Sequence, residues 1–287
     1  MGERSKQNEQ TGDGQKTLRL DGKVAFITAG ANGIGAGAAQ EIARYGGRVT
    51  IADVDAENGE RLVETVRATG GDALFIKTDV LQTEQIDAAI QQTVRHFGRL
   101  DILINNAGGV RGNLFIEQPE RSWRKHIDFN LISMLAATHA GARAMIAAGN
   151  GGTIVNIASS EGLRAAPQYA VYGACKAAMV SFTRSMALEL SAHGIHVHAL
   201  APDMIETPGL NQVGAVTSAA MEAARARYIP LQRVGNVEEI AHLIVFLASD
   251  MASYLTGLTI PVDGGTLAAS GWNRMPGNDQ GWTLYHE

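Results

Sequence analysis

The chain has 287 residues, of which 45% are hydrophobic and 18% are charged, an ordinary soluble composition with enough apolar side chains for one large core. A net charge of −5 argues against a nucleic-acid partner, and no apolar run approaches the eighteen residues of a membrane span. The single cysteine, Cys175, excludes an internal disulfide and fits a reducing compartment, so we expect a cytoplasmic protein in which Cys175 is a buried filler.

The expected elements alternate between apolar runs of strand length and helical patterns. In chain order they are strand 24–28, helix 34–45, strand 48–52, helix 56–69, strand 73–77, helix 83–97, strand 101–105, helix 119–148, strand 153–157, helix 168–193, strand 195–200, helix 237–249 and strand 258–262. Strict alternation with continuously apolar strands predicts an α/β protein, in which helices cover both faces of a parallel sheet.

One domain over residues 18–265 is the economical interpretation. Residues 1–17 are polar without the hydrophobic stretch of a signal peptide, and we expect a flexible arm there. The segment 204–230 interrupts the alternation and is a candidate substrate lid. Residues 266–287 form a tail whose aromatic residues either close a pocket or pack on a neighbouring subunit: Trp272, Trp282 and Tyr285.

The turn after the first expected strand reads TAGANGIG, residues 28–35, and is rich in glycine. Glycines there let a helix N-terminus come close to a pyrophosphate and offer it backbone amides. The spacing is GxxGxG rather than GxGxxG, but the turn follows a strand and opens a helix, as a dinucleotide site requires. We expect cofactor contacts from Gly30, Asn32, Gly33, Ile34 and Gly35.

Asp53 ends the second strand, eighteen residues after Gly35. A carboxylate at this position accepts hydrogen bonds from the adenosine ribose and repels a 2′-phosphate, which favours NAD over NADP. Asp55 competes for the role but better suits a helix cap, and Arg48 opens the strand rather than ending it. Further expected contacts, with a plain turn as the alternative for each loop, are Val54, Asp79, Val80, Asn106, Ala107 and Gly108.

Tyr172 and Lys176 have the i, i+4 spacing of neighbours on a helix, and Ser159 precedes Tyr172 by thirteen positions. An ammonium beside a phenol favours the phenolate and is expected to lower the pKa of Tyr172 towards neutrality. Such a tyrosine acts as a general acid or base, and Ser159 adds a second hydroxyl at the same reacting oxygen. YxxxK alone also occurs by chance on solvated helix faces.

The glycine turn, Asp53, the NNAG segment 105–108, Asn130, Ser159 and YxxxK stand in one order over residues 18–265. Jointly they resemble the short-chain dehydrogenase/reductase family. The resemblance implies a Rossmann-type, doubly wound sheet of seven parallel strands in a single domain, and NAD(P)-dependent hydride transfer between a secondary alcohol and a ketone.

The resemblance also implies roles for individual residues. Tyr172 is similar to the catalytic acid/base, Lys176 to the residue that tunes it and holds the nicotinamide ribose, and Ser159 to the serine that orients the reacting oxygen. Asn130 is similar to the asparagine that holds a relay water. Positions that match the surroundings of the nicotinamide are Pro202, Ile205 and Thr207.

Two positions depart from the family pattern. Ala29 replaces the first glycine of the usual TGxxxGxG turn, although Gly30 is expected to compensate. Asp203 replaces the usual glycine after the sixth strand, which puts the conformation of that turn and the charge on the substrate side in question.

We expect an NAD-dependent alcohol dehydrogenase without a metal. The alternatives are an NADPH-dependent carbonyl or 3-oxoacyl reductase, a non-catalytic dinucleotide-binding module, and a lyase-type relative without cofactor binding. Polar groups near Ser159 favour a polyol, sugar or hydroxy acid as substrate, unless they face solvent in a loop. Candidate substrate contacts besides Ser159 and Tyr172 are Val110, Arg111, Glu161 and Arg164. Ala-rich helical patterns and the family resemblance favour a homotetramer over a dimer.

Overall fold

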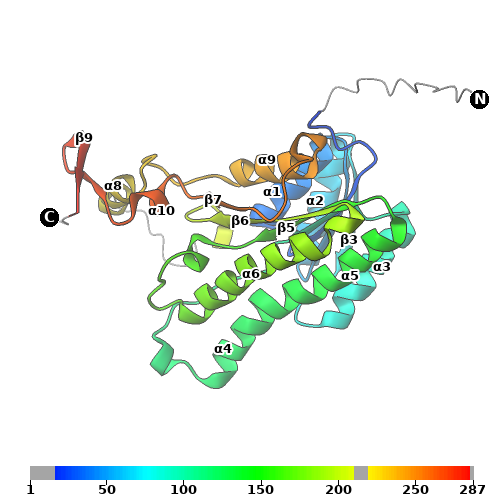
Figure 1. The fold of residues 1–287 in the computed structure, drawn as a ribbon, viewed down its shortest axis with the longest axis horizontal. Coiled ribbons are helices and arrows are strands. Elements are labelled where there is room, and N and C mark those ends of the chain that lie inside the picture. Colours follow the sequence, from blue (N-terminus) through cyan, green and yellow to red (C-terminus); the bar gives the residue numbers. More distant parts are fainter. Residues whose placement is uncertain (1–16, 210–218, 285–287) are drawn as a thin grey trace, which may run out of the picture.

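A seven-stranded parallel sheet forms the centre of the computed structural model, which describes residues 17–209 and 219–284 (Figure 1). The strands lie side by side in the order β3-β2-β1-β4-β5-β6-β7. In chain order they are β1 (Val24–Thr28), β2 (Arg48–Asp53), β3 (Asp72–Lys77), β4 (Ile102–Asn105), β5 (Gly152–Ile157), β6 (Ile195–Pro202) and β7 (Thr259–Val262). The predicted fold class, a doubly wound Rossmann-type sheet, is confirmed.

Helices cover both faces of this sheet (Figure 1). One face packs against α1 (Gly33–Arg44), α2 (Ala56–Ala68) and α9 (Val237–Ala248), and the other against α3 (Thr83–Phe97), α5 (Ser133–Ala148) and α6 (Ala170–Glu189). Within β1, Ala25 and Ile27 pack into the first layer, whereas Phe26 packs into the second. All five residues of β1 are buried, because a parallel strand with helices on both sides has no solvent face.

The strand order reverses between β1 and β4, which are direct neighbours. The connections that follow these two strands leave the sheet towards opposite faces, with α1 in one layer and α5 in the other. Ligands of doubly wound proteins bind at such a switch point. This edge therefore contains the glycine turn after β1 and the NNAG segment after β4.

Two predicted helices differ from those observed. The long helix over 119–148 consists of α4 (Glu120–Ile127), a π-helical turn η2 (Asp128–Ile132) and α5. The helix predicted from residue 168 begins two residues later, because Gln168 has a φ of 69°, which a right-handed helix cannot contain. It ends at Glu189, followed by the 3-10 turn η4 (Ser191–His193).

The predicted lid and tail contain regular structure that the sequence did not indicate. The described part of the lid includes α8 (Ala219–Tyr228), and residues 210–218 lie outside the described residues, as do residues 1–16 of the predicted arm and Tyr285. The tail forms α10 (Thr266–Ala269) and a hairpin of β8 (Asn273–Met275) and β9 (Asn278–Thr283). It contacts the lid region, since Arg274 donates to the Pro230 carbonyl at 3.1 Å.

The continuous helical stretch Glu120–Ala148 is long and apolar enough to cross a membrane by length and composition. Met134, Ala137 and Met145 of this stretch are buried in the hydrophobic core. Core helices of globular proteins pass the same test. The expectation that no segment spans a membrane stays a prediction. Within 17–209 and 219–284, no group of three or more His, Cys, Asp or Glu side chains is arranged to hold a metal ion.

Candidate active site

The glycine turn after β1 is closed too tightly for a side chain at its last position. A Cβ on Gly35 would lie 2.6 Å from the Ala29 carbonyl oxygen and 2.9 Å from the Gly30 Cα. Gly33 has a φ of +53°, in the left-handed region that glycine adopts without strain. The first amides of α1 have no helical partner here, so the turn suits the pyrophosphate of a dinucleotide.

Asn106 ties this turn to the loop after β4. Its side-chain amide donates to the carbonyl oxygens of Thr28 at 3.1 Å and Ala29 at 2.8 Å. The Thr28 hydroxyl accepts from the backbone amides of Asn106 and Ala107, both at 3.0 Å. Asn106 thus joins the ends of β1 and β4, and Thr28 contributes to this junction although sequence reasoning did not single it out.

Asp53 lies at the carboxyl end of β2 with its side chain held at the glycine turn. One carboxylate oxygen accepts from the Ala31 amide and the other from the Asp55 amide, each at 3.0 Å. Asp55 caps α2 by accepting from the Asn58 amide, which confirms its alternative role as a helix cap. Asp53 is therefore a carboxylate held in place at the glycine turn, and its contact with an adenosine ribose stays a prediction.

The other predicted cofactor contacts lie on loops at the same edge of the sheet. Asp79 accepts from the Leu81 amide at 3.0 Å, so it also serves its own turn. Thr207 lies across from the glycine turn, since a Cβ on Gly33 would be 3.4 Å from its methyl group. The remaining residues of this set occupy the start of α1, the end of β6 and the connections after β2, β3, β4 and β6: Asn32, Ile34, Val54, Val80, Ala107, Gly108, Pro202 and Ile205.

Ser159, Tyr172 and Lys176 come together beyond the end of β5. The Ser159 hydroxyl acts on the Tyr172 phenol, whose pKa it lowers, and it accepts from the Glu161 amide at 3.1 Å. Lys176 lies one turn further along α6, with its Nζ 5.5 Å from the centre of the Tyr172 ring. Its ammonium donates to the Ile157 carbonyl at 2.7 Å. The i, i+4 geometry predicted from the sequence is confirmed.

The electrostatics of this group differ from the prediction. Burial raises the pKa of Tyr172 above its usual 10; the hydrogen bond with Ser159 lowers it and the Glu161 carboxylate raises it. Burial also lowers the pKa of Lys176 to about 8. The expected lowering of the Tyr172 pKa towards neutrality is wrong here, because desolvation by burial outweighs the effects that favour the phenolate. Tyr172 therefore keeps its proton at neutral pH.

Asn130 is fully buried in the π-helical turn between α4 and α5. Its side-chain oxygen accepts from the Gly109 amide at 3.0 Å, and its amide donates to the carbonyls of Gly109 and His126. A Cβ on Gly108 would lie 2.8 Å from the Asn130 Oδ1 and 3.1 Å from the Lys176 Nζ. The Asn130 and Lys176 side chains thus both pack against Gly108, just after the end of β4. Single π turns are frequent at functional sites.

The predicted substrate contacts divide into two groups. Glu161 and Arg164 form an ion pair of 2.7 Å, and each side chain is only 24% exposed, so the alternative that both face solvent is wrong. Val110 is half-buried and Arg111 is exposed, both on the loop after β4. No hydrogen bond or ion pair joins these two residues to Glu161 or Arg164 in the described part of the chain.

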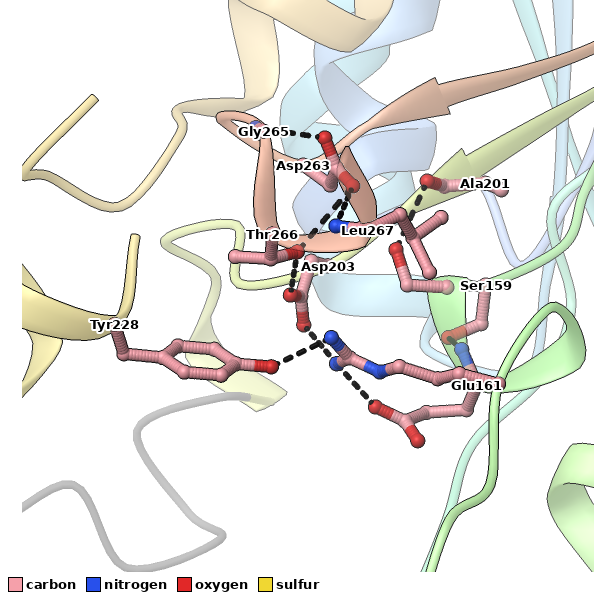
Figure 2. Close-up of polar contacts among 11 residues, drawn as sticks. Ser159, Glu161, Ala201, Asp203, Tyr228, Asp263, Gly265, Thr266 and Leu267 are labelled. Atoms are coloured by element: carbon pink, nitrogen blue, oxygen red, sulfur yellow. Dashed lines mark hydrogen bonds and ion pairs between the residues drawn. The ribbon is translucent and has the colours of Figure 1, made fainter. Parts of the chain in front are cut away.

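Arg164 also binds Asp203 and Tyr228, and Thr266 joins this group through Asp203. Sequence reasoning named none of the three as an individual substrate contact. The Arg164 guanidinium donates to the Tyr228 hydroxyl at 2.5 Å and to Asp203 at 3.1 Å (Figure 2). Thr266 donates to the other oxygen of Asp203 at 2.5 Å. The replacement of the family's glycine by Asp203 was the one available signal. We call Glu161, Arg164, Asp203, Tyr228 and Thr266 the Arg164 cluster.

A reversal of strand order with a glycine-rich turn, a carboxylate at the end of β2 and a serine–tyrosine–lysine group beyond β5 is typical of a Rossmann-type oxidoreductase. Comparison with known proteins agrees. Residues 28–266 match a family model described as enoyl-(acyl carrier protein) reductase.

Characterised relatives cover most of the chain. A 3-oxoacyl-[acyl-carrier-protein] reductase of Thermotoga maritima is 38% identical over 86% of this chain and 99% of its own. A 2,5-dichloro-2,5-cyclohexadiene-1,4-diol dehydrogenase of Sphingobium indicum is 36% identical over 86% of this chain and 97% of its own.

Solved structures are similar as well. A short-chain type dehydrogenase/reductase from Mycobacterium marinum has a TM-score of 0.81 at 34% identity, covering 87% of this chain and 97% of that one. A 7α-hydroxysteroid dehydrogenase complexed with NADH and 7-oxo glycochenodeoxycholic acid has a TM-score of 0.82 at 31% identity, covering 86% and 95%. The chain belongs to the short-chain dehydrogenase/reductase family, whose members bind NAD(P).

Proposed function

We propose that the protein is an NAD-dependent dehydrogenase that interconverts a secondary alcohol and a ketone. The observation that supports NAD is Asp53, whose carboxylate is held between the Ala31 and Asp55 amides at the glycine turn. A negative charge at this position accepts bonds from a ribose diol and repels a 2′-phosphate. The glycine turn suits a dinucleotide, because Gly33 has a left-handed φ of +53° and Gly35 lets the start of α1 pack directly against the turn.

In this proposal, the substrate oxygen lies between Ser159 and Tyr172. Tyr172 exchanges a proton with that oxygen, and Ser159 orients it through its hydroxyl. Lys176 supplies positive charge over the Tyr172 ring and reaches the nicotinamide ribose. Asn130 fixes the loop after β4 through its bonds with Gly109. The bound nicotinamide supplies the hydride acceptor or donor.

The raised pKa of Tyr172 affects the two directions differently. A neutral phenol is ready to protonate a ketone oxygen during reduction. During oxidation, Tyr172 must first lose its proton in order to accept one from the alcohol. We therefore expect the oxidation rate to increase with pH above neutrality and the reduction rate to decrease.

A second candidate, an NADPH-dependent 3-oxoacyl reductase, has support from the reductase of Thermotoga maritima at 38% identity. The diol dehydrogenase of Sphingobium indicum and the NADH complex of the hydroxysteroid dehydrogenase support the first candidate. The position of Asp53 favours NAD, so we retain the NAD-dependent dehydrogenase as the first candidate. The same proposal includes a cytoplasmic location and hydride transfer that needs no metal ion.

The test measures turnover of a panel of secondary alcohols with NAD and with NADP by the absorbance of the reduced cofactor. We expect NAD to be preferred. Tyr172→Phe should lower kcat/KM by roughly 10²–10⁴-fold, the usual contribution of a general acid or base, while NADH binding persists. Tyr254→Phe is the matched control, because Tyr254 is fully exposed.

Each alternative predicts a different result. A preference for NADP contradicts the assignment of Asp53. A non-catalytic module binds NADH without turning over any alcohol or ketone, and a lyase-type relative does not bind NADH.

A further inference from the structure

The Arg164 cluster lies beside the reacting groups. Glu161 follows Ser159 by two residues, and its amide donates to the Ser159 hydroxyl at 3.1 Å. The field of the Glu161 carboxylate reaches the Tyr172 phenol, where it disfavours the phenolate. A substrate bound at Tyr172 is therefore exposed to the same field.

The cluster has more negative than positive charge. Arg164 stands between two carboxylates, Glu161 at 2.7 Å and Asp203 at 3.1 Å, so the three groups sum to −1. Thr266 links Asp203 to a further carboxylate, Asp263, which also accepts from two backbone amides. The Asp203 side chain is only 8% exposed, and water screens partly buried charges weakly. An anionic substrate is repelled by this arrangement.

The hydrogen-bonding capacity that remains matches hydroxyl groups. Arg164 binds Glu161 through Oε1, which leaves Oε2 as an acceptor (Figure 2). Tyr228 accepts from Arg164 and keeps its own proton to donate. Both N–H groups of the Arg164 Nη2 point to carboxylates, so this guanidinium cannot offer the paired edge that binds a substrate carboxylate. A hydroxyl is both donor and acceptor, which is what Glu161 and Tyr228 require.

We infer that the Arg164 cluster selects a neutral, polyhydroxy substrate, such as a vicinal diol or a sugar alcohol, and rejects hydroxy acids. This inference rests on the proposed dehydrogenase activity and narrows its substrate class. Glu161 is the specificity-determining residue, because it is bonded to Ser159 through its amide and its charge acts on Tyr172. Arg164 and Asp203 are positioning residues that hold Glu161 and Tyr228 in place.

The test compares two secondary alcohols of equal carbon count, butane-2,3-diol and 3-hydroxybutanoate, in the wild type and in Glu161→Gln. In the wild type, we expect kcat/KM to be at least about tenfold higher for the diol, a difference of about 1.4 kcal/mol. Glu161→Gln should reduce this ratio at least about fivefold, mainly by lowering KM for the acid, since it removes ground-state repulsion. High salt should reduce the wild-type ratio as well.

Glu64→Gln is the matched control, because Glu64 is exposed on α2. A wild type that uses 3-hydroxybutanoate as well as the diol overturns the inference, and so does a ratio in Glu161→Gln equal to that in Glu64→Gln. The proposed function fails separately, if no secondary alcohol of the wider panel is oxidised. Thermal unfolding with NADH then decides the selectivity: stabilisation by the diol alone supports it, and stabilisation by 3-hydroxybutanoate or by neither compound overturns it.

Discussion

Among single residues, Ala29 is the one whose side chain opposes the conformation of the glycine turn. Its φ of 49° lies in the left-handed region, where a Cβ costs about 1–2 kcal/mol. The turn keeps its shape because Asn106 holds the Ala29 carbonyl at 2.8 Å. The strain explains why glycine is usual at this position in the family.

Ala29→Gly should therefore stabilise the protein by about 1 kcal/mol or somewhat less, since glycine also gains freedom in the unfolded chain. Urea unfolding measures the change. Ala36→Gly on α1 is the matched control and should destabilise by about 1 kcal/mol, because a helix interior disfavours glycine. Equal destabilisation by both substitutions would show that Ala29 is not strained.

His198 on β6 should make the free energy of unfolding depend on pH. It is fully buried, neither ring nitrogen has a hydrogen-bond partner in the described part of the chain, and burial lowers its pKa from 6.5 to about 4. The unfolded chain therefore binds a proton first as the pH falls. Stability should decrease from about pH 6.5 down to about pH 4, by up to ~3 kcal/mol.

Chemical unfolding at pH 7.5, 5.5 and 4.5 measures this loss. His198→Leu should flatten the dependence over that range, whereas His193→Leu, at an exposed position in η4, should leave it intact. A slope unchanged in His198→Leu would assign the acid sensitivity to another group.

Whether a contact between two residues could be predicted depends on how far apart they lie in the sequence. Tyr172 and Lys176 were predictable because i, i+4 neighbours meet on any helix. Asp53 was predictable because a strand end fixes its place. The contacts of Arg164 with Asp203 and Tyr228 join residues 39 and 64 positions apart, and no local spacing encodes such pairs. The pKa of Tyr172 was mispredicted because desolvation depends on burial.

Among the elements, the π turn η2 decides how the site is assembled. It widens the helix by one residue per turn at Asp128–Ile132 and places Asn130 against the loop after β4. A continuous α-helix was predicted over this stretch because apolar spacing does not distinguish an α turn from a π turn. Most other element bounds were predicted to within two residues, whereas α8 and the β8–β9 hairpin were missed.

Asn130→Ala should leave the Gly109 amide and carbonyl and the His126 carbonyl without their side-chain partner. We expect a loss of about 1–3 kcal/mol in unfolding free energy, with faster hydrogen exchange at Gly109. Asn113→Ala, in the exposed part of the same loop, is the control and should do neither. Unchanged protection at Gly109 would mean that η2 does not anchor this loop.

At the scale of the whole molecule, α4 and α6 present an apolar hollow of about 500 Å³ on a face of α6 other than that of Tyr172 and Lys176. Nearby side chains are strongly exposed, with Ile116 at 90% and Phe115 at 56%. Contiguous exposed apolar surface marks interaction sites. The residues that line the hollow are Phe115, Trp123, Ile127, Leu131, Ala170, Val171, Ala174 and Cys175.

We expect this surface to lie between copies of the chain in a homotetramer. Light scattering should then give a mass about four times the 30.4 kDa of one chain. A dimer would give about twice the mass of one chain. Phe115→Asp should shift the mass towards smaller species by placing charge in the interface, while Leu18→Asp, exposed near the N-terminus, should not. A monomeric wild type would contradict the expectation.

The strand order also has a consequence for a nascent chain leaving the ribosome. Asp53 and the glycine turn lie on β1, β2 and the start of α1, so the Asp53 carboxylate can find its two amide partners within the first fifty-five residues. The Arg164 cluster closes only when Thr266 reaches Asp203, 63 positions after it. Because domains begin to fold from the N-terminus during synthesis, the glycine turn and Asp53 can form long before the Arg164 cluster does.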